Sequence, residues 1–130
     1  MNVQIEEALR LLSLAERDQR AFAVLYAHTS LTDFPVAAFH AQQSVEKAFK
    51  AVLCVLGIEY RRTHDLTELA GRIQDRGLSL PISEENLLRL TPYAVELRYD
   101  ENTAQLITPE TARMIVSEVL CWAKMVIDNP

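Results

Sequence analysis

The sequence predicts an all-α protein, a single up-and-down bundle of about five helices. Apolar residues recur every three to four positions through most of the 130 residues, which is the spacing that lines one face of a helix. Only three glycines and five prolines are present, too few for a β protein with many tight turns. The length is usual for one domain, so residues 1–130 are expected to form a single domain.

The first two helices are predicted from this spacing and from the residues at their ends. Residues 3–28 have a polar middle, so they form either one long helix with an exposed centre or two helices in line. The second helix is expected over about 34–56, with Pro35 in its first turn, where proline has no N–H to leave unsatisfied. Gly57 is expected to end it in a left-handed conformation.

The third and fourth helices begin at typical capping residues. Asp65, with Glu68 three positions later, resembles a capping box, in which each side chain serves the other residue's backbone N–H. This helix is expected to end at Gly77. Ser83 caps the fourth helix, which is expected to kink or restart at Pro92 and to continue towards the sequence RYDENT.

The last helix has the clearest start in the sequence. Thr108 supplies a cap, Pro109 occupies the first position, and the acid Glu110 lies near the positive end of the helix dipole. The helix is expected to run to about Ile127. The connections between the predicted helices are short, so neighbouring helices are expected to be mostly antiparallel.

The charge balance argues against a basic nucleic-acid-binding domain. Lysine and arginine total 13 against 18 aspartates and glutamates, a net charge of -5, whereas such domains are usually basic. Residues 47–98 carry eight basic and seven acidic groups. Any RNA contact therefore depends on a local patch, and the alternative for these charges is a set of solvated helix faces.

Cysteine usage and the N-terminal residues indicate a cytoplasmic protein without a metal or cofactor. Cys54 and Cys121 each lie in an apolar helical pattern, so both are expected to be buried thiols, and no cysteine–histidine spacing suits zinc. The N-terminal sequence MNVQIEEALRLL does not read as a signal peptide. No apolar run approaches the ~20 residues needed to cross a bilayer, so no membrane contact is expected.

A polar line on the second helix is the first candidate site. His40, Gln43, Lys47 and Lys50 follow one another at steps of three, four and three, which brings them near one line along a helix. Glu46 and Lys50 have the spacing of a favourable ion pair. The line is either a solvated face or a polar groove that binds phosphate or another chain.

The turn GIEYRRTHD gives the second candidate site. Arg61, Arg62 and His64 precede the start of the third helix, where unpaired N–H groups and the dipole favour an anion. The alternative is that His64 packs in the turn and bonds to a backbone group. Arg98 and Tyr99 are expected near the end of the fourth helix, with Tyr99 able to stack on a base. Together with Lys47 and Lys50, these residues are predicted to share one binding pocket.

Two stretches carry a family resemblance that covers most of the chain. AFHAQQSVEKAFKAVLCVLGIEYRRTHDLTELA has paired glutamines, Glu-Lys-Ala, an apolar run to glycine and Thr-His-Asp-Leu, and LTPYAVELRYDEN follows it. Both resemble the HEPN family. The resemblance implies a bundle of four or five helices, usually a homodimer. It also implies frequent pairing with a minimal nucleotidyltransferase, as a toxin–antitoxin-like pair or a nucleotide-handling complex.

The resemblance also bears on catalysis. Many HEPN domains are metal-independent ribonucleases in which an arginine is followed, after four to six residues, by a histidine. Arg98 is the best match to that arginine, but Thr103, Ala104 and Gln105 stand where the histidine is expected. In addition, Asp100 stands where the family often has proline. Because the chain departs from the family's pattern at these positions, it lacks the usual ribonuclease motif, and no specific ribonuclease activity is expected of the chain alone.

Three hypotheses follow from these residues. The first is a non-catalytic HEPN domain that binds a nucleotidyltransferase, and a nucleotide or RNA, through the candidate residues. The second is a ribonuclease of altered chemistry, with His64 as general acid or base and Arg98 stabilising phosphate charge. The third is a plain helical dimerisation module with no ligand.

Overall fold

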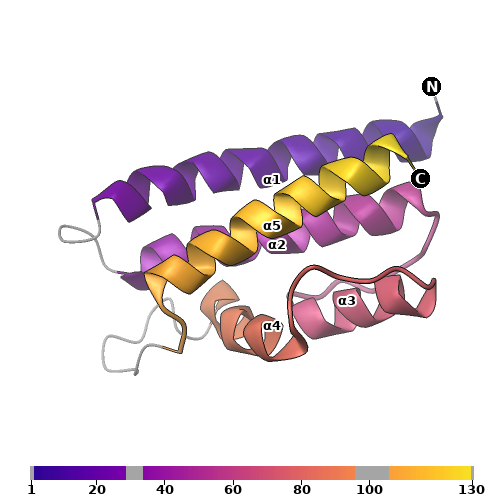
Figure 1. Ribbon diagram of the computed structural model, residues 1–130. Helices are drawn as coiled ribbons and strands as arrows, with labels where there is room; N and C mark the ends of the chain where they lie inside the picture. The colour runs from indigo at the N-terminus through magenta and orange to yellow at the C-terminus, as the bar shows by residue number, and fades with distance from the viewer. Residues whose placement is uncertain (1, 29–33, 96–105, 130) are drawn as a thin grey trace.

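The computed structural model describes residues 2–28, 34–95 and 106–129, and these ranges contain helices and no strand (Figure 1). The elements are α1 (Val3–Ala27), α2 (Phe34–Val55), α3 (Leu66–Asp75), α4 (Glu84–Leu90), the 3₁₀ helix η1 (Thr91–Ala94) and α5 (Pro109–Asp128). The predicted all-α bundle is confirmed. The first segment is one continuous helix, which settles the question that its polar middle left open.

Helix α2 lies at the centre of the bundle. It packs against α1, α5, α3 and η1, and Figure 1 shows α1, α2 and α5 as long neighbouring helices, with the shorter α3 and α4 on the other side of α2. Ala38, Ala41 and Ala48 are fully buried. Their small side chains allow the neighbouring helices to approach closely, because no long side chain separates the backbones.

Capping residues account for where several of the helices begin and end. Asn2 caps α1 by accepting a hydrogen bond from the N–H of Ile5, and Ser83 and Thr108 cap α4 and α5 in the same way. Gly57 after α2 has φ of 71°, which confirms its predicted left-handed conformation.

The predicted capping box at α3 is only half formed. The Asp65 carboxylate accepts from the N–H groups of Thr67 and Glu68, as expected of the cap. The Glu68 carboxylate does not return the bond, because it pairs with Arg61 instead. The N–H of Asp65 donates to the hydroxyl of Thr63.

The fourth helix is shorter than expected. It ends at Leu90 and tightens into η1, which contains Pro92, and the expectation that it remains helical through Val95 is wrong. Proline has no N–H to donate, so the regular α-helical bonding stops there. Tyr93 is buried in η1 and its hydroxyl accepts from the N–H of Leu106 at 3.1 Å. The expected continuation beyond residue 95 lies outside the described residues.

The expectation of two buried thiols is wrong for Cys121 and only partly met by Cys54. Cys121 is exposed because it lies on the solvent side of α5. Cys54 is half-buried, and its thiol donates to the carbonyl of Gln4 at 3.3 Å. Burial raises the pKa of the Cys54 thiol. In the part of the chain that the structure describes, no helix is both long and apolar enough to cross a membrane.

Gly71 inside α3 and Gly77 just after it give a matched pair of stability predictions. Gly71 lies inside α3 with open space where a Cβ would project, whereas Gly77 has φ of 96°. Gly71→Ala is expected to raise the free energy of unfolding by roughly 0.5–1 kcal/mol. Gly77→Ala is expected to lower it by about 1–2 kcal/mol, because a side chain is strained in a left-handed conformation. Urea unfolding followed by circular dichroism measures both changes. Equal effects would contradict the placement of Gly71 inside the helix and of Gly77 in a left-handed conformation.

Candidate functional site

The polar face of α2 forms two clusters, each built around a buried carboxylate. The first is the Glu46 cluster, made of Gln42, Glu46, Lys50 and His64. Glu46 is only 4% exposed. Its Oε1 accepts from Gln42 Nε2 at 3.0 Å and faces His64 Nδ1 at 2.8 Å, while its Oε2 accepts from Lys50 Nζ at 2.9 Å. The predicted Glu46–Lys50 ion pair is therefore confirmed.

Gln42 connects this cluster to the turn before α3. Its side chain is fully buried, and its Nε2 also donates to the backbone carbonyl of His64 at 3.2 Å. Its Oε1 accepts from Gln43 Nε2 at 2.7 Å. Both the oxygen and the nitrogen of the Gln42 amide are thus hydrogen-bonded, as burial requires. The turn that carries His64 is held to α2 through the His64 ring, which meets Glu46, and through the His64 carbonyl, which accepts from Gln42.

The charge of Glu46 is stabilised despite its burial. Burial alone raises the pKa of the carboxyl, but hydrogen bonds from Lys50, Gln42 and His64 outweigh it and hold the pKa below the ordinary value. Lys50 also lies over the ring of Tyr60, at 5.9 Å from the ring centroid. Glu46 is therefore ionised at neutral pH and compensates the ammonium group beside it.

The second cluster is the Asp18 cluster, made of Asp18, His40 and Lys47. Asp18 is buried on α1. Its Oδ1 lies 3.0 Å from His40 Nδ1, and its Oδ2 accepts from Lys47 Nζ at 2.6 Å. Asp18 belongs to the polar middle of α1 and was not among the predicted site residues. A signal was present, because Asp18 lies three residues after the buried Ala15 and so falls on the apolar stripe of α1.

The two histidines are held in the same way. In each case Nδ1 faces the buried carboxylate, and in a neutral imidazole a proton on Nδ1 leaves Nε2 as an acceptor. The His64 side chain is 57% exposed, twice the 29% of His40. In the neutral form with the proton on Nδ1, His64 can therefore offer Nε2 as an acceptor to a bound molecule. Across residues 2–28, 34–95 and 106–129, no group of three or more histidine, cysteine or acidic residues is placed to hold a metal ion.

The structure brings only some of the predicted site residues together. Lys50 and His64 meet at Glu46, whereas Lys47 belongs to the Asp18 cluster. The polar line of α2 is thus neither an open groove nor a simple solvated face, because its cations bond to carboxylates. The alternative that His64 bonds to a backbone group in its turn is not what the structure has, since its ring meets the Glu46 carboxylate.

The predicted arginines lie outside these clusters. Arg61 is exposed and forms a bidentate pair with Glu68. Arg62 is exposed, and no carboxylate among the described residues pairs with it. Arg98 and Tyr99 lie outside the described residues. A pocket shared by all of the candidate residues stays a prediction.

The start of α3 does not offer the free donors that the sequence suggested. The N–H of Leu66 donates to Thr91 Oγ1 at 3.2 Å, and those of Thr67 and Glu68 donate to Asp65. The expectation of unpaired N–H groups at this helix start is wrong, because the cap and a neighbouring threonine use them. Any anion held near His64 would depend on side chains.

Comparisons with known proteins place the chain in a family. Searches of the curated proteins and of the solved structures gave no match. The family model described as the HEPN domain matches residues 6–126, a range that contains α2 through η1 and both polar clusters. The match covers nearly all of the helical bundle, and the chain therefore belongs to the HEPN domain family.

Proposed function

We propose that this chain is a non-catalytic HEPN domain that acts as the binding partner of a minimal nucleotidyltransferase, in a toxin–antitoxin-like pair or a nucleotide-handling complex. One observation carries the proposal: Lys47, Lys50 and Arg61 are each already paired with a carboxylate. A cation that is neutralised by a neighbouring acid attracts phosphate weakly. The paired cations of α2 and of the turn before α3 therefore favour a protein partner over RNA cleavage.

The missing histidine supports the same proposal. The ribonuclease motif of the family pairs an arginine with a following histidine, and Arg98 is followed at the expected positions by Thr103, Ala104 and Gln105. Loss of one proton-transfer group typically lowers the reaction rate ~10²–10⁴-fold.

We propose a cytoplasmic homodimer as the working form. Light scattering that gives a monomer at micromolar concentration would count against the dimer.

Co-expression with the product of the adjacent gene, which the proposal expects to be a minimal nucleotidyltransferase, tests the proposal. The two chains are expected to co-elute from a size-exclusion column in a fixed ratio. The isolated chain is expected to leave single-stranded RNA intact in the presence of a chelator. Failure to co-elute, together with metal-independent RNA cleavage that Arg98→Ala abolishes, would reverse the proposal.

A second candidate function is a ribonuclease of altered chemistry, and the Glu46–His64 pair favours it. A buried carboxylate that fixes an exposed imidazole is the arrangement that orients a general acid or base. In this case the proton would move to or from His64 Nε2 while Glu46 holds Nδ1. Tyr99 stacking and Arg98 contacts to a nucleotide or RNA belong to this candidate as well.

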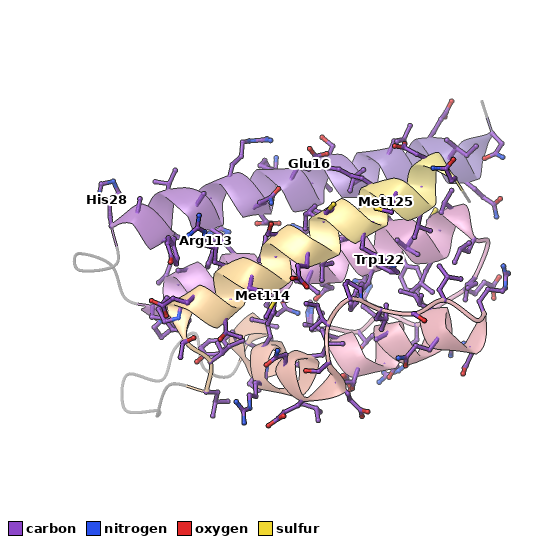
Figure 2. The ribbon with its side chains drawn as sticks, viewed as in Figure 1. Glu16, His28, Arg113, Met114, Trp122 and Met125 are labelled. Carbon is purple, nitrogen blue, oxygen red and sulfur yellow. The ribbon has the colours of Figure 1, made fainter. Side chains whose placement is uncertain are left out.

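Histidine variants distinguish the second candidate from the first. If His64 is the proton-transfer group, His64→Ala is expected to lower RNA cleavage by ~10²–10⁴-fold. His28→Ala is the matched control, because His28 is exposed at the end of α1 (Figure 2) and none of the described carboxylates pairs with it. Equal activity in the two variants would remove His64 from any catalytic role.

A further inference from the structure

A pocket of about 420 Å³ lies between the C-terminal half of α1 and the N-terminal half of α5, and none of its lining residues belongs to either polar cluster. Its walls include Phe22 and Val116, which are almost fully buried, and its length along α1 is set by Gln19 and Ala27. The volume is within the range of about 300–1,000 Å³ that is usual for ligand sites. The pocket therefore has a buried apolar floor and enough room for a large side chain.

Arg113 brings a positive charge to this pocket. Its guanidinium lies over the Tyr26 ring, 5.2 Å from the centroid, and Tyr26 packs in turn against Phe22 at 5.8 Å. Figure 2 shows Arg113 on the side of α5 that faces α1. Stacking on a ring leaves the N–H edge of a guanidinium available. No carboxylate of the described residues pairs with Arg113, in contrast to Lys47 and Arg61.

Two exposed apolar side chains lie one turn from residues of the pocket, although neither lines it. Val24 precedes Ala27 on α1 and is 63% exposed, and Met114 precedes Ser117 on α5 and is 38% exposed. Tyrosine and arginine beside a pocket are among the residues that most often dominate protein–protein interfaces.

We propose that this pocket is the docking site for a segment of the nucleotidyltransferase partner that carries a large apolar side chain next to an aspartate or glutamate. The apolar side chain fills the space above Phe22 and Val116, and the carboxylate forms a bidentate pair with Arg113. The inference rests on the proposed function and adds to it the surface that binds and the chemistry of the bound segment.

Two variants of the full chain test the docking site in complex with the product of the adjacent gene, which the proposed function expects to be a minimal nucleotidyltransferase. Arg113→Glu reverses the charge, and Ser117→Trp places a ring at the exposed wall of the pocket. Each is expected to raise the Kd of the complex on the order of 100-fold, measured by isothermal titration calorimetry. Arg72→Glu is the control: it makes the same charge change on the exposed face of α3 and is expected to leave the Kd unchanged. Unaltered thermal unfolding confirms that the variants are folded.

The outcomes separate the docking site from the proposed function. If the wild-type complex forms and both pocket variants bind as tightly as the wild type, the docking site is wrong and the proposed function stands. If the wild-type chain forms no complex, both are wrong. If Arg113→Glu instead dissociates a homodimer while the nucleotidyltransferase still binds, the occupant of the pocket is a second copy of this chain and the inference is overturned.

Discussion

Replacing Glu46 by alanine is expected to lower the free energy of unfolding by about 3–5 kcal/mol, the usual result of breaking a buried ion pair by removing one partner. The carboxylate is the shared acceptor for Lys50, Gln42 and His64. Without the Glu46 carboxylate, the mostly buried Lys50 ammonium and the buried Gln42 amide each lose an acceptor that water cannot easily replace. Urea unfolding followed by circular dichroism measures the change.

Glu85→Ala provides the control for this prediction. Glu85 and Arg89 have the same four-residue spacing as Glu46 and Lys50, but both side chains are exposed. An exposed pair of this kind contributes about 0–1 kcal/mol. Similar losses from Glu46→Ala and Glu85→Ala would show that burial of the Glu46 cluster contributes little.

The lowered pKa of Glu46 also predicts a pH dependence. A carboxyl whose folded-state pKa lies below its ordinary value of 4.5 contributes stability that is fully present above that value and is lost as the pH falls through the folded-state pKa. The advantage of the wild type over Glu46→Gln is therefore expected to shrink below about pH 4.5. A stability difference between the wild type and Glu46→Gln that stays constant from pH 7 to about pH 3 would contradict a lowered pKa for Glu46.

Phe49→Ala is expected to lower the free energy of unfolding by about 3–5 kcal/mol, because it opens a cavity in the centre of the bundle. The Phe49 ring is fully buried and meets Trp122 edge-on, with centroids 6.0 Å apart and planes at 90°. Trp122 is the only tryptophan in the chain, so its fluorescence reports directly on this contact. Phe49→Leu keeps most of the volume and is expected to cost less; equal losses would exclude a cavity as the cause.

Sequence reasoning predicted those features that depend on residues near one another in the chain. Helical spacing located the helices, and the spacing of Glu46 and Lys50 predicted their ion pair. It did not predict that Asp18 holds His40 and Lys47, because this depends on how α1 is rotated against α2. No local pattern specifies such a rotation.

The site residues of the turn show the same limit. His64 is eighteen positions from Glu46 in the sequence, and only the path of the turn brings the two together. Arg61 was predicted to face an anion, yet it reaches Glu68 on the first turn of α3. A basic residue can be recognised in a sequence, but the acid that neutralises it is set by tertiary structure.

The central position of α2 has a consequence for synthesis on the ribosome. Helices α1 and α2 are neighbours in the chain and can pair as soon as both have emerged, with Ser44 Oγ donating to the carbonyl of Ala15 across the hairpin. The opposite side of α2, which includes Phe49, has to wait until α5 has been translated. During that interval the nascent hairpin exposes an apolar helix face, and that face is the surface on which a chaperone that binds nascent chains is expected to act.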